Sequence, residues 1–123
     1  SLSPNQQRWE SDFGGASGTQ LGKATAAEVE RDGGQYAVFE FGALWWSQAT
    51  GSHRLSPAAN DAYLKAGGPA KSELGFPKID EGPVPKGLVV DGFSAATWVE
   101  FQSGSIACKA KATKAADCQV SLG

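Results

Sequence analysis

The sequence of 123 residues contains no methionine, one histidine and two cysteines. The two cysteines and the distant His53 cannot fill the four positions of a tetrahedral zinc site. No Gly-x-Ser-x-Gly elbow is present that would supply His53 with a serine to activate, and we expect His53 in a surface loop, Gly51–Arg54. The sequence therefore predicts no metal, no cofactor and no catalytic residues.

Long apolar runs and basic clusters are also missing. No run reaches the length of about 18 apolar residues that a membrane-spanning helix needs. The chain has 11 basic and 13 acidic side chains, and no dense basic run precedes Lys109, Lys111 and Lys114, which argues against a nucleic-acid partner. Because the chain starts at Ser1 and lacks methionine, we interpret it as a mature product without its signal segment or as part of a longer protein.

The two cysteines, Cys108 and Cys118, lie ten positions apart near the C-terminus. In a short exported domain an even number of cysteines favours a disulfide. Closing so short a loop stabilises a fold by roughly 2–3 kcal/mol. We therefore expect a disulfide that pins the tail to the last strand, and a secreted protein.

Turn and packing residues recur along the chain at a constant offset of 53 positions. The pairs are Leu2-Ser3-Pro4 with Leu55-Ser56-Pro57, Gly14-Gly15 with Gly67-Gly68, Leu21-Gly22 with Leu74-Gly75, Glu28 with Glu81, and Gly34 with Gly87. Repeats of this length usually stack on copies of themselves, because one unit cannot bury its apolar face alone. The sequence predicts a single domain, residues 1–123, with repeats at residues 2–54 and 55–108 and a disulfide-closed tail, residues 108–123.

Each repeat begins with the pattern of a helix start. Ser3 and Ser56 are suitable N-caps, and proline follows each of them at the first helical position. A Gly-Gly pair ends each pattern, where the first glycine can adopt the left-handed conformation. The prediction is two helices, Pro4–Phe13 and Pro57–Ala66, which are too short to be stable without docking.

A β-hairpin is predicted after each helix. Residues 36–46 are rich in strand formers and are interrupted by Gly42, which favours pairing of Val38–Phe41 with Ala43–Ser47. The second repeat carries nine additional residues around Asp91-Gly92, which predicts a longer hairpin of Leu88–Val90 with Thr97–Phe101. The expected fold class is α+β, with two tandem helix–turn–β-hairpin repeats packed together and short helices on small antiparallel sheets.

A helix ending in Gly-Gly, a Leu-Gly pair, an acidic residue and a Phe-x-x-Gly hairpin follow one another in both repeats. The second repeat carries Leu74-Gly75-Phe76-Pro77, whereas Lys23-Ala24 replace Phe-Pro in the first and Cys108 replaces a terminal tryptophan in the second. This arrangement resembles the LGFP repeat family of exported actinobacterial cell-envelope proteins. The resemblance implies secretion, association with the envelope and non-catalytic binding of its arabinogalactan or peptidoglycan polysaccharide.

Five residues are candidates for ligand binding: Trp45, Trp98, Tyr63, Arg54 and Glu81. Because neighbouring strand residues point to opposite faces, we expect Trp46 to pack and Trp45 to offer an exposed platform for a sugar ring. Glu81, like its counterpart Glu28, either accepts hydrogen bonds from sugar hydroxyls or caps the glycine-rich loop. Arg54 either clamps an anion or is solvated, and the aromatic side chains of Trp98 and Tyr63 either bind ligand or pack.

The sequence is also compatible with two other functions. The inserted segment, residues 90–98, could present an edge to an envelope enzyme or a host factor, which would make the chain a secreted protein–protein interaction module. A small hydrolase is the weakest alternative, because Asp80 and Glu81 are adjacent in extended chain and point apart, whereas glycosidases need facing carboxyls. We expect a monomer whose partner is an envelope polysaccharide or an envelope protein.

Overall fold

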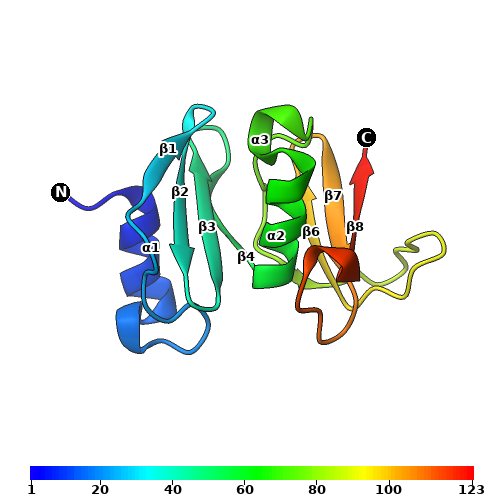
Figure 1. Cartoon of the computed structure of the whole chain (residues 1–123), viewed down its shortest axis with the longest axis horizontal. Helices are drawn as coiled ribbons and strands as arrows, with labels where there is room; N and C mark the ends of the chain where they lie inside the picture. Colours follow the sequence, from blue (N-terminus) through cyan, green and yellow to red (C-terminus); the bar gives the residue numbers. More distant parts are fainter.

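The computed structural model describes all residues 1–123 and has the expected α+β architecture. The first unit contains α1 (Pro4–Phe13), η1 (Gly15–Ser17), β1 (Val29–Arg31), β2 (Gly34–Phe39), β3 (Gly42–Ser47) and β4 (Gly51–Leu55). The second contains α2 (Pro57–Ala66), α3 (Gly68–Lys71), β5 (Gly82–Pro83), β6 (Thr97–Phe101), β7 (Gly104–Cys108), η2 (Ala115–Asp117) and β8 (Cys118–Leu122). Along the molecule the layers are helix, sheet, helix and sheet (Figure 1). None of the helices combines the length and apolarity required to cross a membrane.

Both predicted helices have the predicted bounds, and their ends are built as expected. The side chain of Ser3 accepts a hydrogen bond from the Gln6 amide at 3.1 Å, and that of Ser56 accepts one from the Ala59 amide at 3.2 Å. Gly14 and Gly67 end the helices with φ angles of 77° and 120°, which L side chains rarely adopt. The local sequence therefore determines where both helices begin and end.

Each sheet has four antiparallel strands, in the orders β1-β2-β3-β4 and β5-β6-β7-β8, so the predicted two-stranded hairpins were too small. The predicted pairing in the first unit is present as β2–β3, and it closes at Phe39 opposite Gly42. His53 was wrongly placed in a loop. It lies in β4 opposite Trp45. The polar residues of β4 show no strand pattern in the sequence, and they form a strand because they pair with β3.

The inserted segment of the second unit differs from the prediction. Leu88–Val90 is not a strand; the segment between β5 and β6, residues 84–96, is a loop that projects from the molecule (Figure 1). It replaces the two-residue turn that joins β1 to β2 in the first sheet. Pro83 and Pro85 remove backbone donors where a longer β5 would need them. Gly87 lies in this loop with nothing near its Cβ position, so its match to Gly34 is not structural.

Helix α2 contributes to a core shared by both sheets. The cluster joins residues of the first sheet, of α2, of the second Leu-Gly turn and of the second sheet: Ala43, Trp45, Leu55, Ala59, Ala62, Tyr63, Leu74, Val99, Phe101, Ile106 and Cys108. A smaller cluster lies between α1 and the opposite face of the first sheet: Phe13, Leu21, Ala37, Phe39 and Leu44. The first sheet is therefore covered on both faces, and the second on the α2 face.

The phenylalanine of the Leu-Gly-Phe-Pro motif connects the two units. A Cβ atom on Gly34 of β2 would lie 2.3 Å from the Phe76 ring and 2.4 Å from the Trp46 carbonyl oxygen, so glycine is required there. At the position of Phe76 the first unit has Lys23, which is exposed and has no preceding sheet within the chain to contact. The two motifs thus differ in structure: Phe76 contacts the first sheet, whereas Lys23 faces solvent.

Replacing Gly34 by alanine is expected to lower the free energy of unfolding by about 2 kcal/mol, because the added methyl group must displace an aromatic ring or backbone. Chemical denaturation measures this change. Gly82→Ala is the matched control, since nothing lies within 4 Å of its Cβ position. Equal stability of the two variants would contradict the proposed contact.

Candidate functional site

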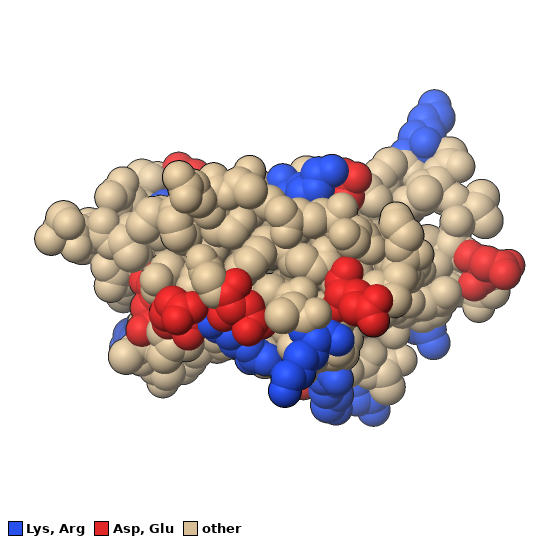
Figure 2. All heavy atoms as spheres, turned by 90° about the horizontal axis from the view of Figure 1, so that it is seen from above, with Lys and Arg blue, Asp and Glu red and all other residues tan.

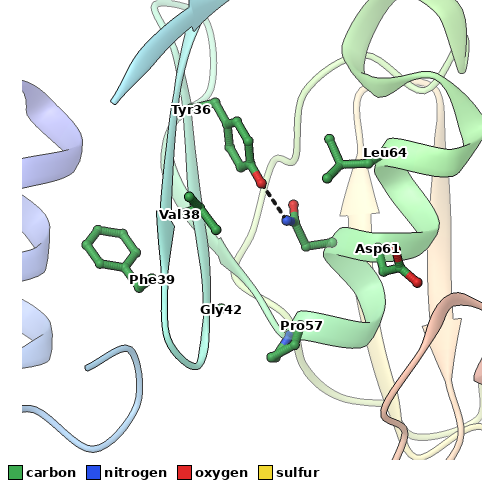
Figure 3. Close-up of a pocket in the computed structure, with 8 residues that line it drawn as sticks. Tyr36, Val38, Phe39, Gly42, Pro57, Asp61 and Leu64 are labelled. Atoms are coloured by element: carbon green, nitrogen blue, oxygen red, sulfur yellow. Dashed lines mark hydrogen bonds between the residues drawn. The ribbon is translucent and has the colours of Figure 1, made fainter. Parts of the chain in front are cut away.

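A groove opens where the first sheet meets α2 (Figure 3). Its volume is about 260 Å³. Both units line it: Tyr36, Val38, Phe39 and Gly42 come from β2 and β3, and Pro57, Asn60, Asp61 and Leu64 come from α2 and its start. The groove therefore exists only because the helix of the second unit docks on the sheet of the first.

A chain of hydrogen bonds fixes the upper part of the groove. The Trp45 indole N–H donates to Asn60 Oδ1 at 2.8 Å, and because an indole only donates, this bond sets the orientation of the amide. The Asn60 amide nitrogen then donates to the Tyr36 hydroxyl oxygen at 2.8 Å. Since the Tyr36 oxygen accepts this bond, its own hydrogen is available to a ligand. The Tyr36 ring stacks on Trp45 with centroids 4.1 Å apart.

Asp61 supplies the charged group of the groove. Its Oδ2 accepts a hydrogen bond from the Ala115 amide at 2.9 Å and lies 3.6 Å from Lys65 Nζ. Ala115 belongs to the C-terminal tail, which the predicted disulfide between Cys108 and Cys118 closes. The tail thus holds one carboxylate oxygen of Asp61, and Oδ1 has no protein partner.

Trp45 is not the exposed platform that was predicted. It is fully buried at 0 % exposure, and Trp46 is the half-buried neighbour. The alternation of faces was right, but α2 covers the face that we expected to be free. Trp45 therefore supports the groove from below and does not line it.

Tyr63 is also a core residue and not a ligand-binding one. It is fully buried, and its hydroxyl donates to the Gly75 carbonyl oxygen at 2.5 Å. Burial, together with the charge of Asp32, raises the pKa of Tyr63 well above its ordinary value. In the first unit Trp9 makes the matching bond to the Gly22 carbonyl at 2.9 Å. In each unit, therefore, an aromatic residue of the helix holds that helix to the Leu-Gly turn.

Glu81 holds the start of α2. Its Oε1 accepts from the Ser56 amide at 2.7 Å, and its Oε2 accepts from the hydroxyls of Ser56 at 3.0 Å and Thr97 at 2.7 Å. Glu28 accepts from the Ser3 hydroxyl at 2.6 Å in the first unit. The duplicated glutamates thus serve structure, as one of the two interpretations had it, but they bind the N-cap serines and not the glycine-rich loop.

The remaining candidates, Arg54 and Trp98, lie apart from the groove. Arg54 donates its backbone N–H to Asp80 Oδ1 at 3.0 Å, and its side-chain Nε is buried without a hydrogen-bond partner. Trp98 lies in β6 opposite Gly82 and Ala107 and is partly exposed. The five predicted residues therefore do not form one site.

Asp80 ties the two units together by an ion pair. Both of its oxygens accept from the Arg8 guanidinium of α1 at 2.5 Å, and Oδ1 also accepts from the Arg54 amide. Partial burial pushes the pKa of Asp80 upward, but the hydrogen bonds from Arg8, His53 and Arg54 outweigh it and hold this pKa well below its usual range. A carboxylate held in its ionised form cannot serve as a general acid.

Residues 21–70 match the family model described as LGFP repeat. This segment is similar to an LGFP repeat. The matched segment runs from the Leu-Gly turn of the first unit through its sheet to α3, so every residue that lines the groove lies within this segment. No curated protein matches the chain.

The ion pair between Arg8 and Asp80 predicts that the stability of the chain decreases at acidic pH. Because the pKa of Asp80 is lower in the folded state than its ordinary value of 3.8, its contribution to stability is present above about pH 4 and is lost as the pH falls further. Asp80→Asn should be less stable than the unmodified chain at pH 7, and the difference should shrink below pH 4. Denaturation curves of both proteins between about pH 2 and pH 7, the range in which carboxyl groups titrate, measure this difference in stability. Asp91→Asn, at an exposed loop position, is the control; a constant difference at every pH would contradict the role of the pair.

Proposed function

We propose that this chain is a secreted module that binds cell-envelope polysaccharide, arabinogalactan or peptidoglycan, without catalysis. The observation that carries the proposal is the groove between the first sheet and α2, which lies entirely within the segment similar to an LGFP repeat. The disulfide between Cys108 and Cys118 supports an oxidising, extracellular location.

The lining of the groove suits a sugar. Val38, Pro57 and Leu64 provide an apolar wall for the C–H face of a sugar ring. The Tyr36 hydroxyl and the free Oδ1 of Asp61 provide a donor and an acceptor for sugar hydroxyls. A small number of placed polar groups on an apolar wall is the usual composition of a ligand site.

Binding without hydrolysis agrees with the carboxylates of the groove. Asp61 is the only acidic residue that lines it, whereas glycosidases use two carboxyls that flank the scissile bond. The charge distribution also favours a neutral polymer. Acidic and basic side chains lie beside one another along one long edge of the molecule, and the middle of this face is mostly uncharged (Figure 2). This face lacks the uniform basic surface that a nucleic-acid partner needs.

The proposal is tested by binding of purified envelope polysaccharide to variants of the groove. Asp61→Asn is expected to weaken binding about tenfold, because a hydrogen bond to a charged acceptor is lost, and Tyr36→Phe about threefold. Calorimetric titration measures both. Glu10→Gln, which neutralises an exposed carboxylate on α1, is the matched control and should bind normally. Unchanged affinity of both groove variants, or full recovery of the unmodified chain in the supernatant with excess polymer, would refute the proposal.

A second candidate function rests on the loop of residues 84–96. Val89 is 85 % exposed and Leu88 is 41 % exposed, and the loop stands away from the rest of the molecule (Figure 1). Exposed aliphatic side chains on a projecting loop fit a protein partner, such as an envelope enzyme or a host factor. In this alternative the chain is a secreted protein–protein interaction module.

The two functions are separated by shortening this loop. Replacing residues 84–96 by the Asp-Gly turn of the first sheet should leave polysaccharide binding unchanged, because the groove lies between β2 and α2. Co-purification of an envelope protein by the unmodified chain, lost in the shortened variant, would favour the alternative. Loss of polysaccharide binding in the shortened variant would instead contradict the assignment to the groove.

A further inference from the structure

The second sheet is covered on one face only. Helix α2 packs on the face that carries Val99, Phe101 and Ile106. No helix covers the opposite face, here called the end face, which lies at one end of the layered arrangement (Figure 1). The first sheet, by contrast, has α1 on one face and α2 on the other.

The strand registers allow the end face to be compared with the face of the first sheet that binds α2. Gly42 and Gly104 occupy equivalent positions in the two sheets. A Cβ atom on Gly42 would meet the Leu55 carbonyl oxygen, and a Cβ atom on Gly104 would meet the Ser121 carbonyl oxygen. This equivalence aligns the strands of the two sheets. Two cross-strand rows of the first sheet face α2: Tyr36–Trp45–His53 and Val38–Ala43–Leu55. The corresponding rows of the end face are Trp98–Ala107–Gln119 and Glu100–Ser105–Ser121.

The end face has lost the groups that bind a helix. Glu100, Ser105 and Ser121 replace the aliphatic row of Val38, Ala43 and Leu55, and the Glu100 carboxylate lies 3.5 Å from Lys78 Nζ. A helix docked here would remove these polar groups from water without giving them new partners. Ala107 replaces the tryptophan that fills the space beneath α2, so a docked helix would also leave a void.

The other end of the stack is altered in the same way. The residues of α2 that meet the first sheet include Asn60, Tyr63 and Leu64. Their counterparts on α1, at the repeat offset of 53, are Gln7, Glu10 and Ser11, and all three are exposed.

We propose that the two units form a closed pair: the end face does not accept the helix of a further LGFP unit, and the outer side of α1 does not accept a further sheet. The proposal holds whether or not the natural chain continues beyond these residues. Repeat stacks end in units with a polar outer face, because an apolar one would remain exposed. The pair then has one junction between units, and one groove.

A fusion in which residues 56–123 are repeated after Ser121, the counterpart of Leu55, tests the end face directly. The added α2 then has the connection that would let it dock. We expect the Trp98 side chain to be labelled by hydroxyl radicals as fast as in the unmodified chain, because the added helix stays undocked. The matched control is the same fusion with Glu100→Val, Ser105→Ala, Ala107→Trp and Ser121→Leu in the junction sheet, in which Trp98 should become protected several-fold.

Protection of Trp98 in the unmodified fusion would overturn the proposal. Labelling of Trp98 in the control fusion would overturn the proposal as well. It would mean that the polar side chains of Glu100, Ser105 and Ser121 are not what prevents a helix from docking on the end face. Sedimentation of the unmodified chain tests both ends together. A monomer at every concentration is expected, and end-to-end association would contradict closure.

Discussion

The docking of α2 between the two sheets is the interaction on which the rest of the structure depends. Trp45 fills the space beneath the helix, its indole N–H fixes the Asn60 amide, and that amide fixes the Tyr36 hydroxyl. One buried side chain thus connects the stability of the stack to the geometry of the groove. An indole without a partner for its N–H would be costly in this dry interface, so the helix has little freedom to shift relative to the sheet.

The two helices could be predicted from sequence, and the role of Trp45 could not. Each helix is defined by a serine N-cap, a proline in the first turn and a closing glycine. These signals act within a few residues, so they can be recognised in the sequence. The alternation of side chains between the two faces of β3 could be predicted as well. Which face is buried could not, because that depends on α2, which docks from the second unit. For the same reason no local signal marks Asn60 and Asp61 as groove residues. The strand β4 was missed because its polar residues acquire strand structure only through pairing with β3.

The duplicated residues have mostly structural roles, which explains why duplication pointed to architecture. Glu28 and Glu81 each bind the N-cap serine of their own helix, and the Leu-Gly turns each receive a hydrogen bond from an aromatic residue of that helix. Phe76 is different, because it contacts the preceding unit at Gly34. The residue at the corresponding position of the first unit, Lys23, is exposed.

The groove differs from these duplicated features because neither unit can form it alone. The sheet contributes the tyrosine hydroxyl and a valine, and the helix contributes the amide, the carboxylate and the remaining apolar wall. In a longer stack each junction would add another such groove, and a polymer lying along the stack could engage several at once, which multiplies avidity. A closed pair, as proposed, has one junction, so polysaccharide binding of the proposed kind would use a single groove. Binding through a single groove would be readily reversible, so under the proposed function a closed pair is better suited to transient association than to permanent anchoring.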